Sequence, residues 1–206
     1  LWEAESPPGE RLQEYVQKEW NGEPHEGETP PRVIAEVLAD SQSAVTAIDA
    51  AAPWVTTNRA EFDRLRNDIR CIRAMSAYYA AKAQAAMFVL RYGYSHDVRD
   101  METAETFLAQ SFSDYQKLSA LASPAYHFAN GMQTSYRKIP IRGAVHGVPA
   151  NYLWSQLVPL YQKELEDFQT KIAKLKQDAA LKPAAGGPAQ KAGSSASPAV
   201  PIYSGL

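Results

Sequence analysis

Apolar residues recur every three or four positions along most of this chain, which is the spacing of one face of an α-helix. Five segments sustain the pattern: residues 10–20, 30–51, 58–92, 97–121 and 150–178. A further short helix is expected near residue 126. The pattern therefore predicts an all-α fold, a bundle of about five or six helices.

The segment 58–92 is the longest because neither proline nor glycine interrupts it before Gly93. As a helix it would extend roughly 50 Å, at about 1.5 Å per residue. Thr57 or Asn58 can cap it, and Glu61 stands three residues after Asn58 as in a capping box. Small residues between positions 80 and 86 would let another helix approach closely. Its buried seam is expected to comprise Phe62, Leu65, Ile69, Ile72, Ser76, Tyr79, Ala83, Ala86 and Leu90.

The segment 150–178 carries large apolar residues at near-heptad spacing. Pro159 lacks a backbone N–H, so we expect it to kink or restart this helix. Together with 58–92, the segment is expected to form two long antiparallel helices. Its apolar row is Trp154, Leu157, Tyr161, Leu165, Phe168, Ile172 and Leu175.

Two further helices have clear starting signals. Thr29 followed by Pro30 is typical of a helix start, and Asp97 can cap the helix over residues 97–121. In the first helix the expected core face is Val33, Val37, Leu38, Val45 and Ile48. In the second it is Val98, Met101, Ala104, Phe107, Leu108, Phe112, Tyr115 and Leu118.

Residues 126–149 lack a sustained period and are expected to form an irregular loop excursion. Aromatic rings stack on the apolar faces of sugars, and the guanidinium group of arginine binds carboxylates through paired hydrogen bonds. This polar segment is therefore the candidate ligand site. Alternatively, it is a crossover whose polar groups bond one another and cap helix ends. The candidate residues are Tyr126, His127, Asn130, Gln133, Tyr136, Arg137, Lys138, Arg142 and His146.

Composition divides the chain into a domain and its flanks. Residues 1–9 are expected to be a connector and 10–178 one helical domain. Residues 179–201 are rich in Ala, Pro, Gly and Ser and are typical of a disordered linker, so 202–206 is expected to begin a further domain or form a tail. The absence of an initial methionine adds to the expectation that the chain was cut from a longer protein.

The charge balance bears on partners. Twenty-one basic and 23 acidic residues give a formal net charge of -2, so nucleic acid is not an expected partner. Lys82, Arg91 and Asp97 interrupt the most hydrophobic region, and no membrane span is expected. The single cysteine, Cys71, is most simply a small core residue.

Familiar catalytic and metal motifs are missing from the sequence. The chain has no glycine-rich phosphate loop, Gly-x-Ser-x-Gly elbow or His-Glu-x-x-His pair, and its four histidines are dispersed. We therefore expect no metal, no cofactor and no catalytic residues. Asp68 can pair with Arg64 or Arg73, although such helix pairs are usually solvated surface contacts.

Two stretches carry a resemblance to a known family: NRAEFDRLRNDIRCI at residues 58–72 and YHFANGMQTSYRKIPIRG at residues 126–143. They resemble the helical region beyond the catalytic barrel in large multidomain bacterial proteins related to glycoside hydrolases. The resemblance covers about residues 10–178. It implies that the acid and base carboxylates of glycoside hydrolysis belong to a barrel that this chain lacks. It also favours an extracytoplasmic location, periplasmic or secreted.

These observations lead to a functional hypothesis with one alternative. The chain is expected to be a non-catalytic helical accessory module that supports or completes a neighbouring catalytic domain, with that domain and carbohydrate as its partners. The alternative is an autonomous binding or scaffolding domain for a protein or a small acidic ligand. An unfamiliar enzyme using Tyr126, His127 or Arg137 is the third hypothesis.

Overall fold

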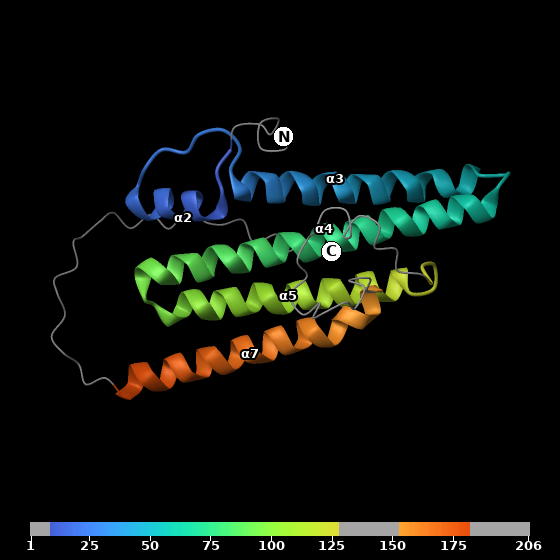
Figure 1. Ribbon diagram of the computed structural model, residues 1–206. Helices are drawn as coiled ribbons and strands as arrows, with labels where there is room; N and C mark the ends of the chain where they lie inside the picture. Colours follow the sequence, from blue (N-terminus) through green and yellow to red (C-terminus); the bar gives the residue numbers. More distant parts are fainter. Residues whose placement is uncertain (1–8, 128–152, 182–206) are drawn as a thin grey trace, which may run out of the picture.

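A computed structural model describes residues 9–127 and 153–181, and this part of the chain is helical (Figure 1). Its helices are α2 (Leu12–Asn21), α3 (Pro30–Ala51), the 3-10 helix η1 (Ala52–Trp54), α4 (Arg59–Ser95), α5 (Val98–Ala122) and α7 (Trp154–Leu181). The only strand-like feature among the described residues is an isolated bridge between Gly9 and Glu28. The all-α prediction is confirmed. The predicted linker at 179–201 lies outside the described residues from position 182 onward.

The four long helices lie side by side in the order α3, α4, α5, α7, and each runs opposite to its neighbour (Figure 1). Helix α2 packs on the C-terminal part of α4. A pair of long antiparallel helices is present, formed by α4 and α5, which only His96 and Asp97 separate.

The pairing of residues 58–92 with 150–178 needs correction. Helix α7 runs parallel to α4, because the chain reverses direction once before α5 and once after it (Figure 1). Tyr78 contacts Tyr161 with ring centroids 5.4 Å apart. Four residues further along α4, Lys82 binds Glu164 at 2.7 Å. Both helices therefore advance in the same direction through this contact.

The ends of α4 differ from the prediction. Asn58 has φ 51°, whereas a capping residue needs an extended backbone, and its side chain makes no capping hydrogen bond. Glu61 instead pairs with Arg64, so the predicted capping box is wrong. At the other end the helix continues through Gly93 and stops before His96, whose φ is 53°.

The other helix ends follow their sequence signals more closely. Helix α3 begins at Pro30 as predicted, and Pro53 lies in η1, directly after the helix ends. The Asp97 side chain accepts a hydrogen bond from the Arg99 amide at 3.0 Å and caps α5 as predicted. Pro159 was expected either to kink α7 or to restart it. Helix α7 continues through this exposed proline, so no restart occurs.

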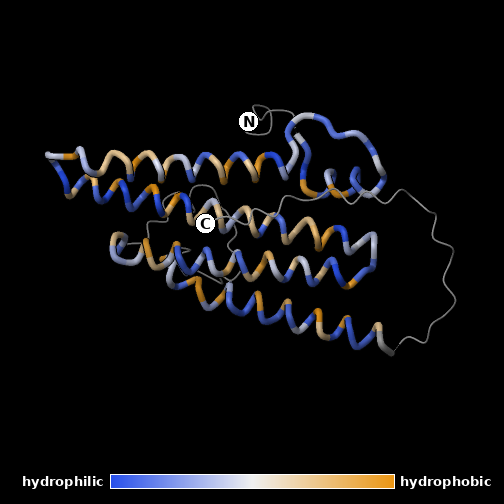
Figure 2. The backbone as a smooth tube through the Cα atoms, turned by 180° about the vertical axis from the view of Figure 1, so that it is seen from behind, coloured by the Kyte–Doolittle hydropathy of each residue, from blue (hydrophilic) through white to orange (hydrophobic). Residues whose placement is uncertain are grey.

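The core lies between α4 and α5 and is closed by the start of α7. Met101 and Ala104 of α5 are 0% exposed, and Tyr115 and Leu118 are 1% exposed. Cys71 is buried in this core, as expected. The inner row predicted for α7 is confirmed, since all seven of its residues are buried or half-buried. Figure 2 shows hydrophobic positions recurring along each helix between hydrophilic ones.

The buried seam of α4 is not the predicted one. Leu65, Ile72 and Tyr79 are about half exposed, and small residues take the inner positions. A seam of small residues lets the α5 backbone approach closely, which explains why the larger residues lie outside the core. On α3 the expected core residues Val33 and Val37 are also exposed. The buried residues of α4 are Cys71, Ala74, Tyr78, Ala80, Ala81 and Ala85.

Candidate functional site

Tyr126 and His127 are the predicted site residues that the structure describes, and they follow the end of α5. The amide of Tyr126 donates to the carbonyl of Ala122 at 2.9 Å, and the Ser123 hydroxyl donates to the Ser119 carbonyl at 2.7 Å. These bonds continue the last turn of α5 past Pro124. They hold Tyr126 against the side of α4.

The Tyr126 hydroxyl donates a hydrogen bond to the carboxylate of Asp68 on α4. This bond, with partial burial and the negative charge of Asp68, raises the pKa of Tyr126 to about 12. The expected pairing of Asp68 with Arg64 or Arg73 is replaced by this contact, because Arg64 binds Glu61 and Arg73 binds Gln42 at 3.1 Å. No local sequence signal links Asp68 to Tyr126, since 58 positions separate them.

A pocket of about 140 Å³ lies beside Tyr126 and His127. The Tyr115 hydroxyl donates to the Trp154 carbonyl at 3.0 Å, and this bond fixes the start of α7 at the pocket. Pockets for drug-sized ligands measure about 300–1,000 Å³, so this one can hold only a small polar group or the edge of a sugar ring. Its lining is Ala122, Ser123, Tyr126, His127, Leu153, Trp154 and Ser155.

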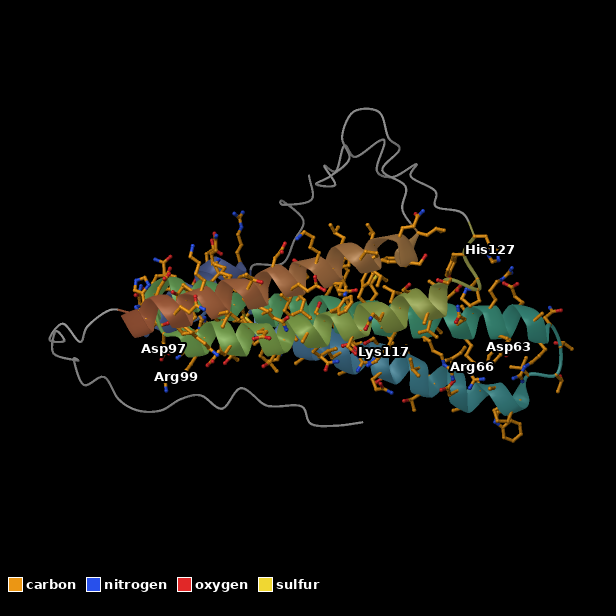
Figure 3. The ribbon with its side chains drawn as sticks, turned by 90° about the horizontal axis from the view of Figure 1, so that it is seen from below. Asp63, Arg66, Asp97, Arg99, Lys117 and His127 are labelled. Carbon is orange, nitrogen blue, oxygen red and sulfur yellow. The ribbon has the colours of Figure 1, made fainter. Side chains whose placement is uncertain are left out.

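The remaining predicted site residues lie outside the described part of the chain. They are Asn130, Gln133, Tyr136, Arg137, Lys138, Arg142 and His146. Figure 3 shows His127 on one side of the helical layer, with Arg66 and Lys117 on the opposite side.

A larger groove of about 610 Å³, which the sequence did not indicate, lies where α2, α4, α5 and α7 meet. Its walls are mainly apolar, including Leu90, Leu108 and Phe168. At its edge the ammonium group of Lys82 lies 4.5 Å from the ring centroid of Tyr161 and binds Glu164. An apolar groove whose charged residues are Arg11 and the Lys82–Glu164 pair suits packing more than polar chemistry.

Burial dominates the electrostatics of the tyrosines packed between α4, α5 and α7. It raises the pKa of the Tyr78 and Tyr115 hydroxyls, which stay neutral at ordinary pH. Among residues 9–127 and 153–181, no group of three or more His, Cys, Asp or Glu side chains could hold a metal ion. No helix in the same ranges is both long and apolar enough to cross a bilayer.

Comparison with known proteins gives a similarity among the solved structures. No family model and no curated protein matches the chain. Among solved structures, the chain is similar to one described as a GH138 enzyme targeting pectin rhamnogalacturonan II, with 38% sequence identity and a TM-score of 0.75. The match covers 82% of this chain but only 24% of that one. The chain is thus similar to a helical region of a glycoside hydrolase and spans about a quarter of that enzyme's length.

Proposed function

We propose that this chain is a non-catalytic helical module of a larger carbohydrate-active protein, in which it supports or completes a neighbouring catalytic domain. The observation that carries the proposal is the 38% identity to a region that makes up 24% of a GH138 enzyme. Identity at this level over most of the chain supports common descent of the two regions. The catalytic carboxylates of the larger protein would then lie in another domain.

The geometry of the described residues supports a structural role. Buried tyrosines close the core. The hydroxyl of Tyr115, for example, donates a hydrogen bond to the backbone carbonyl of Trp154. Two of the charged residues around the larger groove, Lys82 and Glu164, bind each other. A rigid array of this kind can hold a neighbouring domain in place, because packed helices resist deformation.

An activity assay tests the proposal. Residues 1–206 alone, incubated with rhamnogalacturonan II oligosaccharides and with aryl glycosides, are expected to release no sugar. The polypeptide encoded by the whole reading frame around this chain is expected to release sugar from one of these substrates. Turnover by residues 1–206 alone would contradict the proposal, as would an inactive whole polypeptide with no catalytic domain.

Residues 126–146 are the proposed carbohydrate contact of this module. Tyr126 and His127 support this role because they line a pocket together with Trp154, an aromatic residue suited to stacking on a sugar. Calorimetric titration with rhamnogalacturonan II oligosaccharides is expected to show binding that weakens in His127→Ala and Arg137→Ala. Arg32→Ala, on the outer helix α3, is the matched control. Binding of a small acidic ligand in place of oligosaccharide would favour the autonomous binding domain.

A further inference from the structure

Helix α4 carries a second apolar seam that the other described helices leave exposed. Leu65, Ile72 and Tyr79 are 49%, 51% and 58% exposed. Positions seven apart on an α-helix lie nearly in line, so these three residues form one stripe of about 21 Å. We call them the α4 stripe.

The α4 stripe is distinct from the seam that α5 covers. The buried seam includes Ala74, Tyr78 and Ala81, whose exposure is 8% or less. At about 100° per residue, Ile72 points roughly 160° away from Ala74 around the helix axis. Helix α4 is thus apolar on two sides, as expected of a helix that is covered on both.

Exposed apolar residues of the adjacent helices lie level with the stripe. Leu160 of α7, 53% exposed, precedes Tyr161, which contacts Tyr78 next to Tyr79. On α3 the contacts of Asp49 with Arg66 and of Gln42 with Arg73 fix an antiparallel register. This register brings the exposed Val37 to the level of Tyr79. Exposed apolar residues of α3, α4 and α7 therefore lie at one level along the array.

Among the charged residues that flank the stripe, Asp68 and Lys82 have hydrogen-bond partners within the chain, whereas Arg73 donates to the neutral side chain of Gln42. The Asp68 carboxylate accepts a hydrogen bond from the Tyr126 hydroxyl, and the Lys82 ammonium group binds the Glu164 carboxylate at 2.7 Å. A partner covering the stripe would therefore need no opposite charge beside Asp68 or Lys82. Burying paired charges costs less than burying unpaired ones, so the surface suits an uncharged apolar partner.

From these observations we infer that the α4 stripe is the surface on which the adjoining domain of the same polypeptide packs. The inference rests on the proposed function, under which this region is one part of a larger protein. The similar enzyme supports this occupant, since three-quarters of its length lies outside the matched region. Contiguous exposed apolar surface on a folded domain typically marks an interaction site.

Hydroxyl-radical footprinting tests the inference by comparing residues 1–206 with the whole encoded polypeptide. We expect Tyr79, Leu65 and Ile72 to lose most of their labelling in the whole polypeptide. Trp54, 83% exposed at the turn between α3 and α4, serves as the reference that stays labelled. In the whole polypeptide, Ile72→Lys is expected to restore labelling of Tyr79, whereas Trp54→Lys leaves it protected.

Two results would overturn the inference. One is equal labelling of the stripe in both polypeptides, and the other is protection within residues 1–206 that grows with protein concentration, which would indicate a second copy. Sugar release by the whole polypeptide is measured on the same preparation. If sugar is released while the stripe stays labelled, the proposed function stands and the docking surface is wrong.

Discussion

At the residue scale, His25 ties the loop after α2 to both ends of that helix. Its Nδ1 lies 2.7 Å from a Glu10 carboxylate oxygen and its Nε2 lies 2.7 Å from one of Glu19. The ring also stacks on Tyr15 with centroids 4.7 Å apart. Only the protonated imidazolium can donate to both carboxylates at once. Hydrogen bonds to Glu10 and Glu19 accordingly raise the pKa of His25.

Glu10 is the shared acceptor of this cluster. Burial opposes its ionisation, but hydrogen bonds from Lys18, the Glu26 amide and His25 outweigh burial and lower the pKa of Glu10 to about 2. The Glu10 amide also donates to the Glu28 carbonyl at 2.8 Å. The cluster therefore closes residues 10–28 into one compact unit.

The two pKa shifts predict a stability maximum in mildly acidic solution. The pKa of His25 is raised in the folded chain, so its contribution is complete below the ordinary value of 6.5 and is lost as the pH rises through the raised value. The pKa of Glu10 is lowered, so its contribution is present above 4.5 and is lost as the pH falls toward 2. Amide exchange of residues 10–28 is expected to be slowest, relative to intrinsic rates, between these limits.

The variant His25→Gln isolates the alkaline side of this prediction. It is expected to remove the loss of protection above pH 6.5 while leaving the exchange of α5 unchanged. Protection of residues 10–28 that varies equally with pH in both proteins would contradict the role of His25.

At the scale of the element, truncating a side chain on the buried face of α5 is expected to destabilise the fold far more than truncating one on the exposed face of α4. Leu118→Ala removes a side chain that is 1% exposed and should reduce the free energy of unfolding by about 2–5 kcal/mol. Leu65→Ala, at a position that is 49% exposed, should change it by about 0.5 kcal/mol or less. Urea denaturation measures the change in the free energy of unfolding for both variants. Similar changes would show that Leu65 is buried as Leu118 is and that the exposed face of α4 is assigned wrongly.

Much of each helix could be predicted from its own sequence. Pro30 and Asp97 mark helix starts by local chemistry, and the inner positions of α5 and α7 follow from large apolar residues at regular spacing. The seam of α4 could not be predicted in this way, because Leu65, Ile72 and Tyr79 are larger than the alanines that α5 covers. The choice between two apolar faces depends on the neighbouring helix.

The candidate site was less predictable than the helices. The sequence placed Tyr126 and His127 in a polar segment, but their contacts with Asp68 and Trp154 join distant parts of the chain. Asn58 similarly begins a sequence typical of a capping box, yet the tight turn after η1 gives Asn58 a positive φ. In each case a constraint from outside the local sequence decides the outcome.

At the scale of the whole molecule, α3 is the least supported of the long helices. It packs mainly on α4, only Ser41 is buried within it, and Asp49 binds Arg66 and Arg70 at its C-terminal end. Hydrogen exchange should therefore be faster in α3 than in α5, since local opening follows low burial. Asp49→Asn is expected to speed exchange in α3 and leave α5 unchanged. Equal protection of α3 and α5 would mean that the array opens only as one unit.

His127 and Leu153 border the same small pocket, so these two residues lie close together although they are far apart in the sequence. The free energy of closing a loop grows only slowly with its length, by about 0.6 kcal/mol for each doubling. Relatives of this protein can therefore gain or lose residues between these two positions at little cost to the four long helices. We expect this end of the array to tolerate exchange of the sequence between the two positions while the scaffold is kept.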